Sequence, residues 1–265
     1  MSRLAALFEQ LKKNQRRALV PYVVAGDPNP GITVNLMHAL VESGADIIEL
    51  GVPFSDPMAE GPTIQLAHER ALKHHTSLTD ALKMVTEFRQ KDSATPVVLM
   101  GYANPVERMG YAVFADAAQK AGVDGLLTVD MPPEEADDLN KELKRVAIDN
   151  VFLLAPTTTD ERIRKIAALA SGYLYCVSLK GVTGAGNLDL AAVEAQVNRI
   201  KAITNLPLTV GFGIKDAESA KAIGRYTEGV VVGSALVQRI ADNGGDAAAA
   251  TILMRELRAA LDSLK

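Results

Sequence analysis

Eight short apolar runs recur along almost the whole 265-residue chain, and this repetition constrains the fold more than any other feature of the sequence. The runs are mostly continuous rather than alternating polar with apolar residues, which is typical of parallel strands covered on both faces. They predict eight β-strands. The runs are ALVPYVVAG (18–26), DIIELGV (46–52), PVVLMGY (96–102), DGLLTVD (124–130), VFLLAP (151–156), YLYCVSL (173–179), LPLTVGFG (206–213) and GVVVGSALV (229–237).

Segments with the apolar spacing of an amphipathic helix separate these runs. The clearest of them cover residues 32–41, 136–146, 163–169, 190–203 and 252–264. No linker, low-complexity tract or break in composition interrupts the alternation. Eight strand–helix units in a chain of about 250 residues predict an α/β fold, a single-domain (β/α)8 TIM barrel over residues 1–265.

A doubly wound sheet is the rival fold. GFGIKDA has only two of the three glycines of a dinucleotide-binding fingerprint, and GVTGAG has the wrong spacing for one. The N-terminal segment carries Leu4, Phe8 and Leu11 at helical spacing among charged residues, without the continuous apolar core of a signal peptide. We therefore expect a barrel preceded by a short extra helix.

Composition excludes several classes of partner. Hydrophobic residues make up 48% of the chain and the net charge is −4, which suits a globular protein and gives no footprint for nucleic acid or an anionic membrane. No apolar run approaches the roughly 18 residues of a membrane-spanning helix. The single Cys176 cannot form an internal disulfide, and it is expected to pack in the core. These features predict a cytoplasmic protein.

Two acids near the second predicted strand are the first candidates for chemistry, because a barrel of this type carries its active site at the carboxyl ends of its strands. Glu49 lies in the apolar run DIIELGV, and no basic residue in the adjacent runs could pair with it. Burial raises the pKa of such a carboxyl towards neutrality, so we expect Glu49 to be catalytic. Glu60 lies in the following loop, where pattern alone favours a structural acid.

Glycine-rich segments follow the last three predicted strands. They are GVTGAG (181–186), GFGI (211–214) and GSA (233–235). Glycine lets backbone N–H groups approach an anion, and the loops after the seventh and eighth strands form the usual phosphate site of the fold. The sequence therefore predicts a phosphate ester as ligand.

Other polar residues have simpler interpretations. His68, His74 and His75 lie in a helical segment predicted to be solvated, and no Cys, His and acidic residues share metal-ligand spacing, so no metal is expected. Asp130 is expected to cap a helix beginning at Pro132 or Pro133. A Schiff-base nucleophile would have to project from a strand end, and Lys180 is the one candidate for it.

The longest motif is ELGVPFSDPMAEGPTIQ, residues 49–65. It resembles the signature of the tryptophan synthase alpha chain family, which reads close to E-L-G-[IV]-P-F-S-D-P-x-A-D-G-P-x-I-Q. YVVAGDP, MGYANP, VDMPPEEA, LLAPTTT, SLKGVTGAG, VGFGIKDAESA and VVVGSALV resemble further family motifs in the same order. The resemblance covers essentially the whole chain.

This resemblance implies retro-aldol cleavage of indole-3-glycerol phosphate to indole and glyceraldehyde 3-phosphate. It implies no cofactor in this chain, pyridoxal phosphate in a partner β subunit that uses the indole, and an α2β2 assembly. Glu49 would give and take the protons of the reaction, and Glu60 would stabilise the positive charge that develops at the indole nitrogen.

The resemblance also implies three groups of contact residues. The indole pocket would be formed by Tyr22, Met100, Tyr102, Leu127, Val129, Leu153 and Tyr175, with Thr183 hydrogen-bonded to the acid at position 60. Gly184, Phe212, Gly213, Gly233 and Ser234 would bind the phosphate. Pro53, Asp56, Asn104 and Pro105 would face the β subunit.

One departure from the family pattern leaves the function open, because the family has aspartate where this chain has Glu60. The extra methylene could misplace the carboxylate, and a misplacement of about 1 Å can cost on the order of 100-fold in rate. The chain could then be an impaired α-type subunit that mainly binds and activates the β subunit. It could also be a different phosphate-handling barrel, such as a sugar-phosphate epimerase or isomerase, or a free-standing lyase that releases indole.

Overall fold

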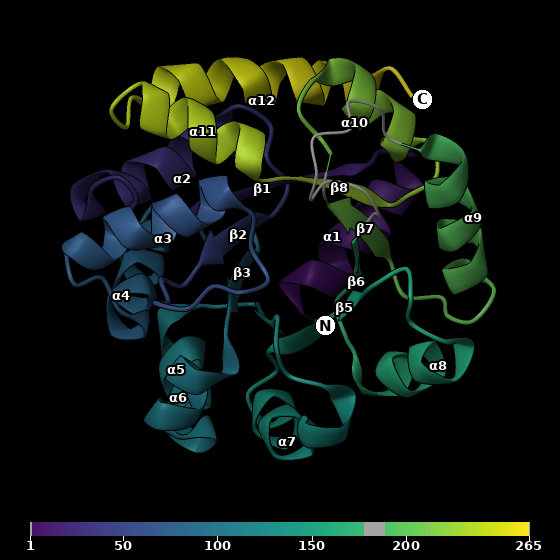
Figure 1. The fold of residues 1–265 in the computed structure, drawn as a ribbon, viewed down its shortest axis with the longest axis horizontal. Helices are drawn as coiled ribbons and strands as arrows, with labels where there is room; N and C mark the ends of the chain where they lie inside the picture. The colour runs from purple at the N-terminus through teal and green to yellow at the C-terminus, as the bar shows by residue number, and fades with distance from the viewer. Residues whose placement is uncertain (1, 178–188, 212, 265) are drawn as a thin grey trace.

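A closed barrel of parallel strands forms the centre of the molecule (Figure 1). The computed structural model describes residues 2–177, 189–211 and 213–264. Within these ranges, eight strands pair in chain order and β1 also pairs with β8, which closes the sheet and confirms the predicted TIM barrel. The strands are β1 (Ala18–Val24), β2 (Ile48–Gly51), β3 (Val97–Gly101), β4 (Gly125–Thr128), β5 (Asp149–Leu154), β6 (Leu174–Val177), β7 (Leu208–Gly211) and β8 (Gly229–Val232).

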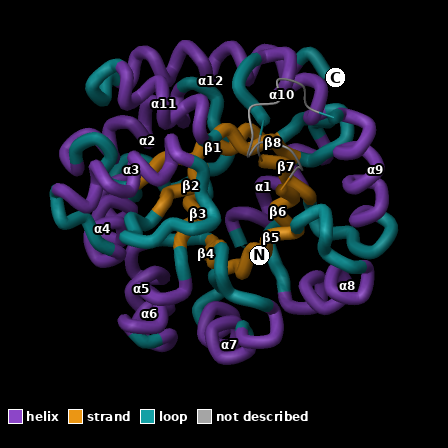
Figure 2. Tube along the Cα trace, in the orientation of Figure 1, coloured by secondary structure: helices purple, strands orange, loops and turns teal. Residues whose placement is uncertain are grey.

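Helices form a ring around the strands (Figure 2). The helical segments predicted from apolar spacing are confirmed. The described helices are α1 (Arg3–Lys13), α2 (Thr33–Glu42), α3 (Pro62–Lys73), α4 (Leu78–Phe88), α5 (Ala103–Met109), α6 (Tyr111–Ala121), α7 (Asp137–Arg145), α8 (Asp160–Leu169), α9 (Leu190–Lys201), α10 (Ala217–Gly224), α11 (Ser234–Asp242) and α12 (Ala247–Asp262), with short 3-10 turns at Pro30–Ile32 and Pro133–Glu135.

Two apolar cores hold these layers together. The outer core lies between the strands and the surrounding helices and contains Cys176, whose predicted role in core packing is confirmed. The inner core fills the barrel, and the predicted extra helix α1 contributes Leu4, Phe8 and Leu11 to it. Phe8 packs against the fully buried Tyr173 with ring centroids 5.8 Å apart. The N-terminal helix is therefore part of the barrel's packing rather than an appendage.

At the amino-terminal edge of the barrel, the same type of contact recurs in four of the eight strand pairs, β1–β2, β3–β4, β5–β6 and β7–β8. In each pair, a polar side chain just before the even-numbered strand accepts a hydrogen bond from a backbone N–H at the start of the preceding strand. The acceptors and donors are Asp46 and Leu19 at 2.8 Å, Asp124 and Val97 at 2.8 Å, Ser171 and Asn150 at 3.1 Å, and Glu228 and Leu208 at 3.0 Å. These contacts satisfy buried donors at the end opposite the predicted active site.

Asp130 does not have its predicted role. Its carboxylate accepts a hydrogen bond from the backbone N–H of Ala103 at 2.7 Å, at the start of α5. The turn at Pro133–Glu135 has no side-chain cap, and Pro132 occupies its N-cap position. The prediction was wrong because β3 and β4 lie side by side, so the end of one strand reaches the helix that follows its neighbour.

Asp124 is one of two acceptors at this edge that also pair with a largely buried arginine, as Asp46 does with Arg258. Asp124 accepts from Arg89 at 2.7 Å, and these two side chains are only 4% and 11% exposed. Asp124→Ala is expected to lower the free energy of unfolding by about 3–5 kcal/mol, because it leaves the Arg89 guanidinium buried without a carboxylate. The measurement is urea unfolding.

Glu228→Ala is the matched control. Glu228 has the equivalent place before β8, but its side chain and that of its partner Lys201 are 40% and 37% exposed. Its loss should cost about 1 kcal/mol. Equal losses in the two variants would show that the backbone contact, rather than the buried charge, carries the effect.

Candidate active site

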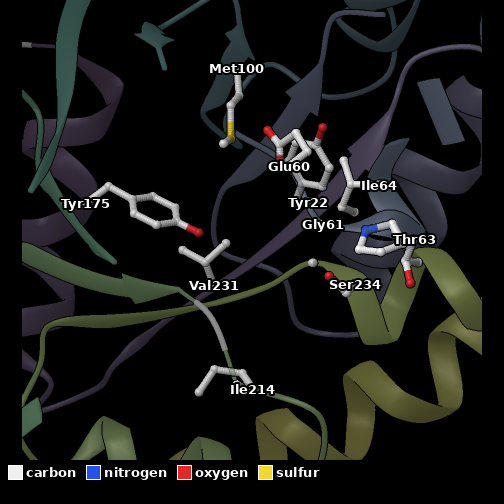
Figure 3. A pocket seen from close by; sticks show the side chains of 13 residues that line it. Tyr22, Glu60, Gly61, Thr63, Ile64, Met100, Tyr175, Ile214, Val231 and Ser234 are labelled. Carbon is white, nitrogen blue, oxygen red and sulfur yellow. The ribbon is translucent and has the colours of Figure 1, made fainter. Parts of the chain in front are cut away.

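A cavity of about 340 Å³ opens at the carboxyl ends of the strands (Figure 3). Its walls come from β1, β3, β6 and β8 and from the segments that follow β2, β7 and β8. This is the end at which barrels of this type carry their active sites. The lining residues are Tyr22, Glu60, Gly61, Pro62, Thr63, Ile64, Met100, Tyr175, Gly213, Ile214, Val231, Gly233 and Ser234.

Glu49 lies in β2, beside Tyr22 of β1 in the strand register, and is fully buried. It is not among the residues that line the cavity. The Tyr173 hydroxyl donates to its Oε1 at 2.6 Å, while its Oε2 has no hydrogen-bond partner among the described residues. Burial raises the pKa of Glu49 to about 8, against the lowering effect of the Tyr173 hydrogen bond, and the charge of Glu60 adds to the rise. Glu49 therefore holds a proton at neutral pH.

Glu60 lies on the cavity wall, in the loop between β2 and α3 (Figure 3). Its backbone carbonyl accepts from the Gln65 side chain at 2.9 Å, and its backbone N–H donates to the carbonyl of Pro57 at 3.0 Å. Partial burial raises the pKa of its carboxyl to about 7. Two carboxyl groups that titrate near neutral pH thus belong to one region of the barrel.

The side chains of two tyrosines, Tyr22 and Tyr175, each lie against a glycine of the neighbouring strand. A Cβ at Gly51 would overlap the Tyr22 hydroxyl, and a Cβ at Gly211 would overlap the hydroxyl of Tyr175. In the parallel register, each tyrosine pairs with the residue two positions before the glycine: Tyr22 with Glu49, and Tyr175 with Thr209. The glycines that end β2 and β7 are thus required by the tyrosines that line the cavity.

The cavity also contains a place suited to an anion. Ser234 begins α11, whose first turn has no side-chain cap, so its N–H groups are available to a negatively charged ligand. Gly213, with φ at +79°, lines the same cavity together with Gly233. Gly184 and Phe212, also predicted to bind phosphate, lie outside the described residues, as does Thr183.

The residues predicted for an indole pocket fall into two groups. Tyr22, Met100 and Tyr175 line the cavity. The others lie deeper or to the side: Leu127 is buried in the inner core, and Val129 and Leu153 pack against that core. Tyr102 is buried and stacks on Phe54 at 4.8 Å, and its hydroxyl accepts from the N–H of Ala59 at 3.1 Å.

The four residues predicted to face a partner subunit lie in the loop after β2 and at the start of α5. Asp56 and Asn104 are exposed, Pro105 is half-buried and Pro53 is buried. Met58, in the same loop, is 80% exposed. The loop therefore presents both a charge and an apolar side chain to the outside.

Two residues of the site were not found from the sequence. His68 was expected to be solvated, but it is buried and its ring contacts both Phe54 and Tyr22. Its position on α3 faces the barrel, which the spacing of Ile64, Ala67, His68 and Ala71 could have indicated. Tyr173 was assigned only to an apolar run, and no sequence pattern predicts its hydrogen bond to Glu49.

The fold and the cavity define a (β/α)8 barrel of the enzymatic type, with two carboxyl groups of raised pKa towards the carboxyl ends of its strands. Comparison with known proteins gives the particular family. The family model described as "Tryptophan synthase alpha chain" matches residues 8–263. The tryptophan synthase alpha chain of Methylococcus capsulatus is 61% identical over 241 residues, which cover 91% of this chain and 90% of that protein.

Solved structures agree with the sequence comparison. The tryptophan synthase subunit alpha of Legionella pneumophila superposes with a TM-score of 0.93 at 46% identity, over 99% of both chains. An open form of tryptophan synthase from M. tuberculosis gives a TM-score of 0.90 at 36% identity, over 98% of this chain and 99% of that one.

The chain belongs to the tryptophan synthase alpha chain family. Its activity is that of an indole-3-glycerol-phosphate lyase, an aldolase-type carbon–carbon lyase of tryptophan biosynthesis. The alpha chain of this family works without a cofactor, and pyridoxal phosphate belongs to the β subunit. In the described ranges, no three His, Cys, Asp or Glu side chains are grouped to hold a metal ion, and no helix is long and apolar enough to cross a membrane.

The raised pKa of Glu49 predicts a pH-dependent penalty on stability. The folded chain keeps the Glu49 proton up to about pH 8, whereas the unfolded chain loses it near the ordinary glutamate pKa of 4.5. Stability from this group is therefore fully present below pH 4.5 and is lost as the pH rises towards 8, at up to about 1.4 kcal/mol per pH unit.

Glu49→Gln removes this titration and keeps an acceptor for Tyr173. The variant should gain stability relative to the unaltered chain between pH 5 and pH 8, by a few kcal/mol in total. Chemical denaturation at a series of pH values measures the gain. A difference that does not change with pH would mean that Glu49 is already ionised in the folded protein.

Proposed function

We propose that Glu49 and Glu60 carry out the lyase reaction of this chain. The observation that supports this most directly is a fully buried carboxyl group with a pKa of about 8. Among the described residues it has no basic partner, and its neighbour Tyr22 lines the same cavity as the second acid, Glu60. A carboxyl that holds its proton at neutral pH can serve as a general acid and, once ionised, as a general base.

Cleavage of indole-3-glycerol phosphate needs three events. Indole C3 gains a proton, the hydroxyl next to the breaking bond loses one, and the ring N–H becomes more positive. Protonated Glu49 supplies the first proton and its carboxylate removes the second, so the group returns to its starting state as indole and glyceraldehyde 3-phosphate form. Glu60, as a carboxylate, stabilises the positive charge at the ring nitrogen.

The position of Glu49 adds a requirement to this mechanism. Its carboxyl is hydrogen-bonded to Tyr173 and lies outside the cavity lining. To reach the substrate, the side chain must leave Tyr173 and turn towards the cavity. The partner lost in this movement is a neutral hydroxyl and not a buried cation, which keeps the cost to about that of one hydrogen bond.

We assign the substrate contacts as the family resemblance implies them. Tyr22, Met100 and Tyr175 line the cavity and suit a flat apolar ring, and Gly213, Gly233 and Ser234 surround the place suited to the phosphate. Tyr102, Leu127, Val129 and Leu153 would form the deeper wall of the indole pocket. Thr183, Gly184 and Phe212 remain proposed contacts outside the described residues.

We also propose that residues 1–265 form one cytoplasmic domain that works in an α2β2 complex. The single closed barrel supports one domain. The loop after β2 supports the partner, because it exposes Asp56 and Met58 beside the cavity wall formed by Glu60. Pro53, Asn104 and Pro105 complete the proposed β-subunit contact, and the indole product would pass to that subunit for the synthesis of tryptophan.

The longer side chain of Glu60 supports a second candidate function. Where the family has aspartate, one added methylene could hold the carboxylate away from the indole nitrogen. The chain would then bind and activate the β subunit with little turnover of its own.

The decisive experiment is indole release from indole-3-glycerol phosphate, with and without a β subunit, for the unaltered chain and for Glu60→Asp. Equal and substantial rates are expected if the loop after β2 has adapted to glutamate. Turnover by Glu60→Asp alone would establish the activator. Glu49→Gln is the negative control and should lose at least about 100-fold in rate, since it cannot transfer a proton. Activity retained in Glu49→Gln would refute the assignment.

A further inference from the structure

His68 connects two parts of the site from within α3. The backbone N–H of Phe54 donates to its Nδ1 at 3.0 Å, and the hydroxyl of Tyr22 lies 3.3 Å from its Nε2. The contact between His68 and Tyr22 is shielded from water, because the two residues are only 2% and 5% exposed. A buried histidine whose two ring nitrogens both have hydrogen-bonding partners has a defined ring orientation and a defined tautomer.

The Phe54 contact determines which nitrogen carries that proton. A backbone N–H can only donate, so Nδ1 must accept and cannot be protonated. Burial lowers the pKa of His68 to about 4, so the ring is neutral at neutral pH. A neutral ring with an unprotonated Nδ1 has its hydrogen on Nε2. His68 therefore donates to the oxygen of Tyr22.

The Tyr22 hydroxyl, used as an acceptor by His68, must direct its own hydrogen elsewhere. Within the described part of the chain, the contact with His68 is the one hydrogen bond of this hydroxyl. Tyr22 lines the cavity, and burial and the charges of Glu60 and Glu49 raise its pKa, which keeps the hydroxyl protonated. The site thus contains an oriented donor that lacks an acceptor among the described residues.

The neighbours of Tyr22 indicate which part of a ligand it would meet. Its Cβ and Cδ1 lie 3.8 Å from the position of a Cβ at Gly233, next to the α11 N-terminus, and its hydroxyl lies over Gly51. The side chain therefore extends from the proposed phosphate site towards the end of β2, the strand that carries Glu49. In the substrate, the segment between phosphate and indole is the glycerol chain.

We propose that His68 is a positioning residue for the lyase reaction. By donating to the Tyr22 oxygen, it orients the Tyr22 hydroxyl so that this group donates its own hydrogen to a hydroxyl oxygen of the substrate's glycerol chain. This inference rests on the proposed function. The indole ring offers an N–H donor and no comparable acceptor, and the phosphate has the α11 N-terminus. The chain hydroxyls are the remaining acceptors.

Two replacements of His68 separate its two contacts. Asparagine places an oxygen near the position of Nδ1, so His68→Asn keeps the acceptor for Phe54 and loses the donor to Tyr22. Glutamine places an amide nitrogen near the position of Nε2, so His68→Gln keeps the donor and loses the acceptor. A merely structural role, anchoring the loop at Phe54, predicts the opposite ranking of the two variants.

The expected result is a rise in KM for indole-3-glycerol phosphate of about three- to tenfold in His68→Asn and in Tyr22→Phe, with kcat changed less. His68→Gln should stay within about twofold of the unaltered chain. The double variant Tyr22→Phe/His68→Asn should be no worse than Tyr22→Phe alone. Normal kinetics in His68→Asn, or equal losses in the asparagine and glutamine variants, would overturn the proposal.

A substrate analogue tests the acceptor itself. Indolylpropyl phosphate keeps the ring and the phosphate but has no chain hydroxyls, so its inhibition constant should be the same in Tyr22→Phe and in the unaltered chain. A weaker inhibition in the variant would assign the Tyr22 hydrogen to another group and overturn the inference. An unaltered chain without lyase activity would refute the proposed function, whereas an active one that does not separate the His68 variants would refute this inference alone.

Discussion

Closure of the sheet is the constraint on which the rest of this structure depends. β1 pairs with both β2 and β8, so every strand has two neighbours and the sheet has no open edge. Closure brings the carboxyl ends of all eight strands to the end of the barrel where the cavity opens, and α1 packs into the inner core of the barrel. The four polar contacts at the amino-terminal edge, from Asp46, Asp124, Ser171 and Glu228, satisfy donors that closure buries.

The same closure produces the chemistry of the site. An interior filled by side chains excludes water from Glu49, and the exclusion of water raises its pKa. Tyr173 provides a hydrogen bond without a charge, so the carboxyl is held in place but is not forced to ionise. A buried arginine in the place of Tyr173 would have given a permanent carboxylate, which cannot protonate carbon. The choice of a neutral partner is therefore as important for the proposed mechanism as the burial itself.

How much could be predicted from the sequence differs between the scaffold and the site. The strands, the order of the helices and the candidate Glu49 followed from local pattern, because continuous apolar runs and helical spacing report burial directly. Asp130 and His68 were misjudged because their partners are distant in sequence: Ala103 for the first, Phe54 and Tyr22 for the second. Tyr173 escaped notice for the same reason, since 124 positions separate it from Glu49.

The sequence by itself determined the class of fold, the family and the presence of an unpaired acid in an apolar strand. These depend on periodicity and on a long ordered motif, which are properties of the chain alone. Only the tertiary structure decided which neutral group holds Glu49, which glycines make room for Tyr22 and Tyr175, and which nitrogen of His68 carries its proton. Each of these depends on contacts between neighbouring strands or on the packing of α3 against the barrel, and the closed sheet sets those contacts.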